Sequence, residues 1–307
     1  STIDTMPVNS RIAFCGTGLM GAGMLASLAR AGAELAVWNR TRAKAESAAP
    51  PGAQVHGTPA EAARGAEAAV LALSDPAAVR AVIDGPAGLA AGLRRGAVVL
   101  DTSTVDPATS RWAAGRLAEV GVDFLDTPVY GSKAEAARGE LGFLVGGAPE
   151  VVARALPLLQ AMGRNIHPLG PVGAGTTTKL MLNAVIAMTL AAAQEGLVFA
   201  AKSGLDARVV LDVLLASRAR SGILEMKGPR MLDHDFEPFF ALRLMHKDLR
   251  LALDAAAAAE VPMPGLAALA PVFETAMSDG LADEDFAATV KVREAAAATS
   301  LRRAPTP

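Results

Sequence analysis

The stretch RIAFCGTGLMGAGM at 11–24 carries the glycine spacing GxGxxG where an apolar strand gives way to a helix. Gly16 permits the turn, Gly18 lets a pyrophosphate approach the backbone, and Gly21 allows the helix to pack closely on the strand. The N-terminus of the helix favours an anion through its free N–H groups and its dipole. The motif in this context predicts a dinucleotide-binding βαβ unit. The predicted cofactor contacts of this loop are Gly16, Gly18, Leu19, Met20 and Gly21.

The next strand, ELAVWN at 34–39, ends in residues that select the dinucleotide. An acidic residue at this point would bind the ribose hydroxyls of NAD and repel a 2′-phosphate. The chain instead has Asn39, Arg40 and Thr41. A guanidinium pairs with a phosphate through charge-assisted hydrogen bonds, so these three residues are predicted to bind NADP(H). The alternative is that the arginines of this segment only begin an exposed helix.

The strand pattern repeats at 68–73, 97–104 and 123–129, with alanine-rich helical segments between the strands, and a further strand follows at 141–147. This alternation predicts a Rossmann-type, doubly wound parallel sheet over residues 11–165. Ligands bind beyond the carboxyl ends of such strands. The polar or small residues at these ends are therefore candidate site residues: Ser74 for the cofactor, Thr104 for cofactor and substrate, and Tyr130, Gly131 and Ser132 for the substrate.

A long, mostly apolar helix is predicted over 174–203, and it joins the sheet domain to an all-α domain over 166–300. Further helices are expected at 205–217, 240–260 and 266–280. Lys179 and Asn183 are four residues apart on the long helix and so share one of its faces. Desolvation beside the apolar helix would lower the pKa of Lys179 toward the range that suits proton transfer. The alternative is a lysine that extends from the helix start into solvent.

Composition excludes several other classes of protein. The 307 residues are 51% hydrophobic and 20% charged, and a formal net charge of −2 gives no basic excess for nucleic acid. One cysteine and four histidines, without a cluster, predict no metal site, no internal disulfide and a cytoplasmic location. Polar residues interrupt the long helix, so we expect no membrane span. Residues 1–10 are expected to be a disordered leader.

Five motifs in one order resemble the β-hydroxyacid dehydrogenase family, from residue 11 to about residue 291. They are GTGLMGAGM at 16–24, DTSTVDP at 101–107, DTPVYGSKAEAARGEL at 126–141, GAGTTTKLMLN at 173–183 and FALRLMHKDLRLAL at 240–253. The resemblance is strongest to the NADP-using glyoxylate and succinic semialdehyde reductases. It implies that Lys179 transfers the proton, that Asn183 is its partner, and that Phe240, Lys247 and Asp248 lie near the substrate. Lys247 is expected to contact the cofactor as well.

The resemblance implies reversible hydride transfer between NADPH and a small aldehyde or keto acid. One departure concerns the substrate: Tyr130 stands where the family usually has a serine. The substitution admits an imine as substrate, so the alternative enzyme is an imine reductase. The alternative that is not an enzyme is a non-catalytic NADP-binding protein. The long helix, apolar on most sides, predicts a homodimer or homotetramer.

Overall fold

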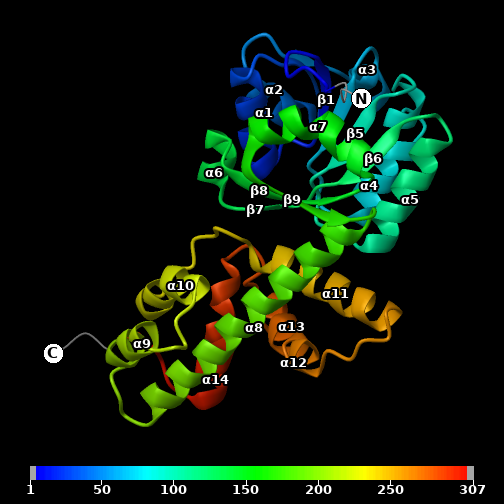
Figure 1. Ribbon diagram of the computed structural model, residues 1–307. Helices are drawn as coiled ribbons and strands as arrows, with labels where there is room; N and C mark the ends of the chain where they lie inside the picture. Colours follow the sequence, from blue (N-terminus) through cyan, green and yellow to red (C-terminus); the bar gives the residue numbers. More distant parts are fainter. Residues whose placement is uncertain (1–4, 303–307) are drawn as a thin grey trace. The chain divides into compact units, whose positions relative to one another are not determined.

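The computed structural model describes residues 5–302 (Figure 1). The chain divides into two compact units between Lys179 and Leu180. The expected domain boundary at residue 165 falls inside the last strand of the first unit, which spans Gly163–Gly170. The sheet therefore continues at least five residues beyond the end that the sequence suggested.

The first unit is built on a sheet that has nine strands within the described residues. These strands are β1 Arg11–Cys15, β2 Glu34–Trp38, β3 Gln54–Val55, β4 Ala68–Leu71, β5 Val98–Asp101, β6 Asp123–Asp126, β7 Val129–Tyr130, β8 Leu141–Gly146 and β9 Gly163–Gly170. Their order is β3-β2-β1-β4-β5-β6-β8-β7, and β9 also pairs with β8. The order reverses between β1 and β4, and such a switch point is where doubly wound sheets bind ligands.

The sheet is parallel from β3 to β6, as predicted, but the far edge is mixed. β8 runs antiparallel to both β6 and β7, whereas β9 is parallel to β8. The predicted doubly wound sheet is thus parallel over most of its width, with an antiparallel edge beyond β6 that the sequence did not indicate. The short connection from β6 through β7 to β8 explains the reversal, because α6 within it spans only Lys133–Arg138, which is too short for a crossover between parallel strands.

Both faces of the sheet are covered, which explains the continuous apolar runs of its strands. In β1, Ile12 and Phe14 belong to one buried cluster, and Ala13 and Cys15 belong to another on the opposite face. The covering helices are α1 Leu19–Arg30, α2 Arg42–Ala48, α3 Pro59–Ala63, α4 Pro76–Asp84, α5 Pro107–Ala118, α6 Lys133–Arg138 and α7 Pro149–Met162, with a 3₁₀ turn η1 at Leu89–Ala91. A Rossmann-type domain is confirmed.

The second unit is helical, as predicted. Helix α8, Ala174–Lys202, carries the chain into it. The other helices are α9 Ala207–Ala216, α10 Gly222–Asp233, α11 Leu242–Ala258, α12 Pro264–Ala267, α13 Ala270–Ser278 and α14 Val290–Ala297, with a 3₁₀ turn η2 at Phe286–Thr289. The sequence did not indicate α10, which contains Gly228 and Pro229, or α14. One expected helix at 266–280 is split into α12 and α13.

The structure describes the expected leader only from residue 5 on. Residues 1–4 lie outside the described residues. Met6, however, is 6% exposed, and its N–H donates to the Arg154 carbonyl oxygen at 3.0 Å. The prediction of disorder is wrong at this position, because burial of an apolar side chain against the core of the first unit stabilises the fold.

Candidate active site

In the glycine loop between β1 and α1, one glycine has open space beside it, and two others are packed so closely that a Cβ would not fit. Gly16 has φ +105°, and a Cβ there would collide with the Ala72 carbonyl oxygen. A Cβ at Gly21 would collide with the Gly16 carbonyl oxygen. At Gly18, by contrast, no described atom lies within 4 Å of the place a Cβ would take. Gly18 also begins α1 without any side-chain cap. The loop thus fits a pyrophosphate bound against the first-turn N–H groups, which include those of Leu19 and Met20.

The end of β2 is tied to this loop. The Asn39 side-chain oxygen accepts from Thr17 N at 3.1 Å, and its amide donates to the Thr41 carbonyl oxygen at 3.0 Å. Thr41 is the residue before α2. Arg40 is exposed, whereas Arg42 is paired with Glu46 at 2.8 Å. Of these two arginines, Arg40 is therefore the candidate for binding a 2′-phosphate.

The segments that follow β4 and β5 are joined by a hydrogen bond. The Leu73 N–H donates to Ser103 Oγ at 2.9 Å, which connects the segment before Ser74 to the segment before Thr104. Ser74 Oγ donates to Asp75 at 2.6 Å, and Asp75 in turn caps α4. Thr104 is half-buried. The structure thus brings two predicted site residues to one edge of the sheet.

Tyr130 makes a contact that sequence analysis did not predict. Its hydroxyl lies 2.9 Å from His167 Nε2, and its ring covers Gly142, where any Cβ would collide with it. His167 is exposed on β9, and β7 and β9 are both neighbours of β8. A phenol and an imidazole therefore share one hydrogen bond at this edge. The pairing could not be read from residues 37 apart in sequence.

Gly131 and Ser132 turn the chain from β7 into α6. Gly131 has φ +129°, which few other residues adopt. The Ser132 hydroxyl accepts from Glu135 N at 3.2 Å, and the Glu135 carboxylate accepts from Ser132 N. Ser132 therefore acts as a helix cap in this structure. Its hydroxyl hydrogen stays available as a donor, because the cap uses the oxygen only as an acceptor.

Two buried aspartates lie opposite each other at the ends of β5 and β6. Asp101 and Asp126 are register partners, and both are at most 1% exposed. Burial, with a smaller contribution from the charge of Asp126, raises the pKa of Asp101 to about 7. Burial also raises the pKa of Asp126, against three hydrogen bonds from Gly173 N, Thr176 N and the Thr176 hydroxyl. Sequence analysis assigned neither carboxylate.

Helix α8 carries both predicted catalytic residues. Lys179 is half-buried and lies one turn before Asn183. Asn183 is 3% exposed, and its amide donates to Asp248 Oδ2 at 2.7 Å. The other oxygen of Asp248 pairs with the ammonium of Lys247 at 2.8 Å. In the second unit, three predicted residues from α8 and α11 thus form one network.

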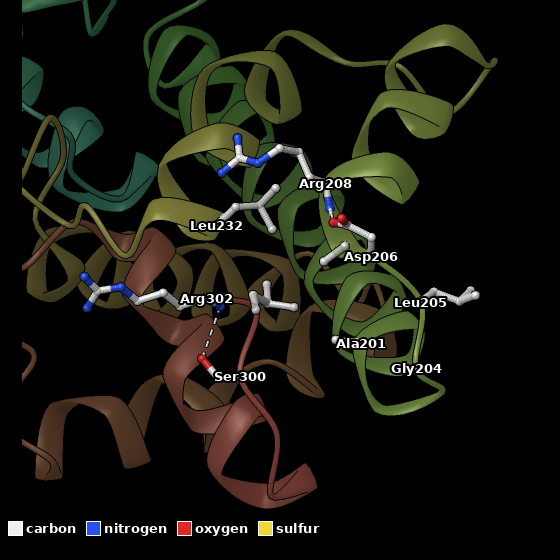
Figure 2. A pocket seen from close by; sticks show the side chains of 10 residues that line it. Ala201, Gly204, Leu205, Asp206, Arg208, Leu232, Ser300 and Arg302 are labelled. Atoms are coloured by element: carbon white, nitrogen blue, oxygen red, sulfur yellow. Dashed lines mark hydrogen bonds between the residues drawn. The ribbon is translucent and has the colours of Figure 1, made fainter. Parts of the chain in front are cut away.

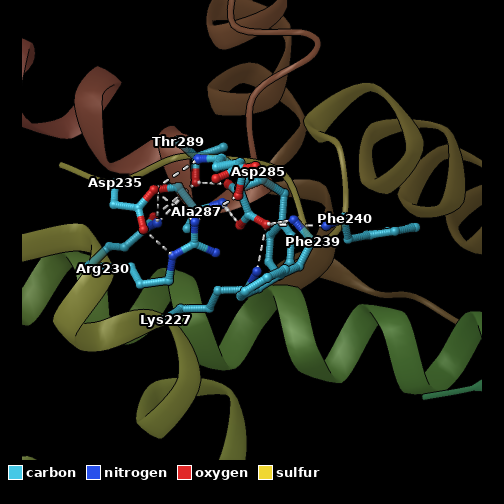
Figure 3. Close-up of polar contacts among 11 residues, drawn as sticks. Lys227, Arg230, Asp235, Phe239, Phe240, Asp285, Ala287 and Thr289 are labelled. Atoms are coloured by element: carbon cyan, nitrogen blue, oxygen red, sulfur yellow. Dashed lines mark hydrogen bonds and ion pairs between the residues drawn. The ribbon is translucent and has the colours of Figure 1, made fainter. Parts of the chain in front are cut away.

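Phe240, the remaining predicted residue, is held by a buried ion pair (Figure 3). Lys227 Nζ lies 2.6 Å from Asp285 Oδ2, and both side chains are at most 2% exposed. The same oxygen accepts from the N–H groups of Phe239 and Phe240 at 3.0 and 3.2 Å. Burial lowers the pKa of Lys227, while its hydrogen bond to Asp285 opposes that change. This pair fixes the segment that leads into α11.

A cavity of about 290 Å³ lies elsewhere in the second unit (Figure 2). It is lined by residues around the α8–α9 connection and the segment after α14, including Asp206, Arg208 and Ser300. It contains none of the predicted site residues. Within residues 5–302 there is also no group of three or more His, Cys, Asp or Glu side chains placed to hold a metal ion.

The fold and the open glycine loop define a dinucleotide-binding protein of the Rossmann type. Residues 11–170 match the NAD-binding domain of 6-phosphogluconate dehydrogenase, and residues 173–293 match the NAD-binding domain of NADP-dependent 3-hydroxyisobutyrate dehydrogenase. Glyoxylate/succinic semialdehyde reductase 2 of Arabidopsis thaliana is 34% identical over 285 residues, which cover 93% of this chain and 80% of the relative. The chain belongs to the β-hydroxyacid dehydrogenase family and is an oxidoreductase that acts on CH–OH groups.

Solved structures agree with this assignment. The 3-hydroxyisobutyrate dehydrogenase of Mycobacterium tuberculosis, in a structure with L-serine, superposes with a TM-score of 0.86 at 31% identity, over 92% of this chain and 99% of that one. An imine reductase from a Pseudomonas species has a TM-score of 0.60 at 21% identity, over 92% of this chain and 99% of that one. At that identity the likeness shows the fold alone.

One relative is named for something other than an enzymatic activity. The human cytokine-like nuclear factor N-PAC is 33% identical over 285 residues, which cover 93% of this chain but 52% of N-PAC.

Proposed function

We propose that this protein catalyses reversible, NADPH-dependent reduction of a small aldehyde or keto acid to the hydroxy acid, with Lys179 as the general acid and base. The cofactor supplies the hydride when it is bound. The observation that carries the proposal is the network on α8 and α11, in which Asp248 fixes the amide of Asn183 one turn after Lys179. A buried, bonded amide next to a half-buried lysine suits a site built for proton transfer better than a solvent-exposed helix face.

Lys179 would donate a proton from Nζ to the substrate oxygen during reduction and would accept it back during oxidation. Asn183 donates to Asp248, so its side-chain oxygen is left to accept from the lysine or from the substrate hydroxyl. Lys247 would add a positive charge for a substrate carboxylate. Its pairing with Asp248 at 2.8 Å holds that ammonium in place.

The segment after β5 and the turn after β7 would bind the rest of the substrate. Thr104 offers a hydroxyl, and Gly131 and Ser132 offer backbone and hydroxyl donors. Tyr130 would border the substrate on one side, with its phenol anchored by His167 at 2.9 Å. A bulky, fixed ring in place of a serine restricts the size of the acid, so the relatives' substrates are the first compounds to test.

The hydrogen bond between Tyr130 and His167 also favours a second candidate, an imine reductase. Reduction of an imine needs a proton donor for nitrogen, and a phenol bonded to an imidazole is a suitable donor. Lys179 favours the carbonyl, because an ammonium that donates to an alkoxide is the more direct arrangement. A non-catalytic NADP-binding protein is the third possibility, and it would bind NADPH without consuming it.

The test is NADPH oxidation with glyoxylate, succinic semialdehyde, methylmalonate semialdehyde, tartronate semialdehyde and a cyclic imine, for the wild type and for Lys179→Ala. We expect turnover with one of the aldehyde acids and a loss of at least ~100-fold in the variant. Turnover of the imine alone would reject the carbonyl reductase. An unchanged rate in Lys179→Ala would reject Lys179 as the general acid and base. Binding of NADPH without turnover of any compound would support the non-catalytic protein.

We further propose a cytoplasmic protein that does not cross a membrane. Helix α8 is long and apolar enough for a span, and 44% of its most apolar 18-residue window is buried within the fold. Burial of this kind suits a core helix, and the remaining apolar surface of α8 suits a contact between subunits. Recovery of the full-length protein in the high-speed supernatant after cell lysis tests this proposal, and recovery in the membrane pellet would reject it.

A further inference from the structure

The first turn of α8 is held by one buried carboxylate. Asp126 ends β6 and is completely buried. Its Oδ1 accepts from Gly173 N at 2.8 Å, and its Oδ2 accepts from Thr176 N at 2.8 Å and from the Thr176 hydroxyl at 3.3 Å. Both oxygens are therefore used as acceptors by the segment that starts α8.

The packing around this carboxylate is close, and it depends on two glycines. A Cβ at Gly146 would collide with the Asp126 carboxylate, and a Cβ at Gly175 would collide with the Leu144 carbonyl oxygen. Glycine at these two positions lets the first turn of α8 lie directly against β6 and β8. The Thr176 hydroxyl also accepts from Ser110 of α5 at 3.3 Å. Its single hydrogen can be donated either to Asp126 Oδ2 or to the Gly173 carbonyl oxygen, which lies at 3.1 Å.

Two acceptors facing two N–H groups require a carboxylate. An asparagine could accept from only one of Gly173 N and Thr176 N, and its NH₂ group would face the other donor. Such an unpaired, buried donor is costly, so the turn would move away to find water. A carboxylate at a helix N-terminus is in addition favoured by the helix dipole.

We infer that Asp126 is a positioning residue for Lys179: its carboxylate fixes the first turn of α8 and thereby the place of the lysine in the turn that follows Thr176. The inference rests on the proposed role of Lys179. Lys179 lies three residues after Thr176 on the same helix, so a shift of the first turn moves the lysine with it. A displacement of about 1 Å at a reacting group costs up to ~100-fold in rate.

A double-mutant cycle tests the inference, with kcat and KM measured for Asp126→Asn, Lys179→Ala and the double variant on the best substrate. We expect Asp126→Asn to lower kcat by roughly 10- to 100-fold with little change in the Kd for NADPH. In the Lys179→Ala background, Asp126→Asn should have almost no further effect, because there is no lysine left to misplace.

The matched control is Asp206→Asn, which changes the same atoms at the N-cap of α9. Asp206 Oδ1 accepts from Arg208 N at 2.9 Å, and asparagine caps such an exposed helix about as well as aspartate. Asp206→Asn should keep kcat within about twofold. A similar loss in both Asp126→Asn and Asp206→Asn would show a general effect on stability and would overturn the inference.

If Asp126→Asn does not fold, Thr176→Val provides the same cycle, because it removes one hydroxyl from the cluster and keeps the backbone bonds. We expect Thr176→Val to lower kcat a few-fold when Lys179 is present and to leave kcat unchanged in the Lys179→Ala background. Equal effects in both backgrounds, or an unchanged kcat in Thr176→Val, would overturn the inference while leaving the proposed function intact. An unchanged rate in Lys179→Ala by itself would instead reject the proposed function.

Discussion

At the scale of single residues, we assign the proposed preference for NADPH to Arg40. Its exposed guanidinium follows β2, while Arg42 is already paired with Glu46 at 2.8 Å. We predict that Arg40→Ala raises the Kd for NADPH about tenfold or more, because charge-assisted hydrogen bonds to the 2′-phosphate are lost, and leaves the Kd for NADH nearly unchanged. Fluorescence titration measures both constants. Arg42→Ala is the control, and an equal effect in it would contradict the assignment to Arg40.

Asp101 makes the stability of the protein depend on pH. Its pKa in the folded state is raised from the ordinary 3.8 of an aspartate to about 7, because burial disfavours the charged form. Between pH 4 and 7 the folded protein keeps a proton that the unfolded chain has released, so the free energy of unfolding falls as the pH rises. The loss is on the order of 4 kcal/mol and is complete above about pH 7.

We therefore predict that Asp101→Asn, which cannot ionise, gains stability relative to the wild type as the pH rises from 4 to 7. Below pH 4 the two proteins should differ least, because Asp101 is protonated in both folded and unfolded chains. Urea unfolding at several pH values measures the difference. Parallel curves for the two proteins across this range would show that Asp101 is already ionised when buried.

At the scale of elements, the pair Lys227–Asp285 joins α10 to the turn that begins η2. We predict that Lys227→Met destabilises the protein by roughly 3–5 kcal/mol, because it leaves the Asp285 charge buried without its partner. The double variant Lys227→Met/Asp285→Asn should recover part of that loss. Chemical denaturation gives both values. A double variant that is less stable than Lys227→Met would show that Asp285 acts mainly through its backbone hydrogen bonds.

Helix α8 carries residues of both units. Its extent, 174–202, differs from the predicted 174–203 by one residue, because the Ala-rich and Leu-rich sequence has high helix propensity throughout. Its partners could not be predicted. The bond from Asn183 to Asp248 joins residues 65 apart, and the bond from Gly173 to Asp126 joins residues 47 apart.

At the scale of the whole molecule, we predict a homodimer or homotetramer, as the apolar character of α8 suggests. Large apolar side chains are exposed on the second unit, including Phe199 at 75%, Val213 at 62%, and Leu205 and Val209 at 59% each. Exposed apolar residues in such number favour contact with another copy of the chain. Light scattering coupled to size-exclusion chromatography measures the mass. A monomer at micromolar concentration would contradict the prediction.

The sequence by itself determined the order of the elements and the location of the glycine loop. These features are local: strand and helix periodicity, the turn at Gly16 and the apolar length of α8 depend on neighbours in the chain. The motif resemblance supplied Lys179, Asn183, Lys247 and Asp248, and the comparisons confirmed the family from which they were drawn. Their individual roles stay predictions.

Only the tertiary structure decided which side chains meet. The antiparallel edge at β8, the contact of Tyr130 with His167 and the carboxylate of Asp126 beneath α8 all depend on pairings across 37 to 50 residues of sequence or on strand direction. Such pairings have no signal in local periodicity, because they are set by which strands and side chains lie next to each other once the core has packed. The sequence thus located the parts of the candidate site, and packing determined how those parts are held.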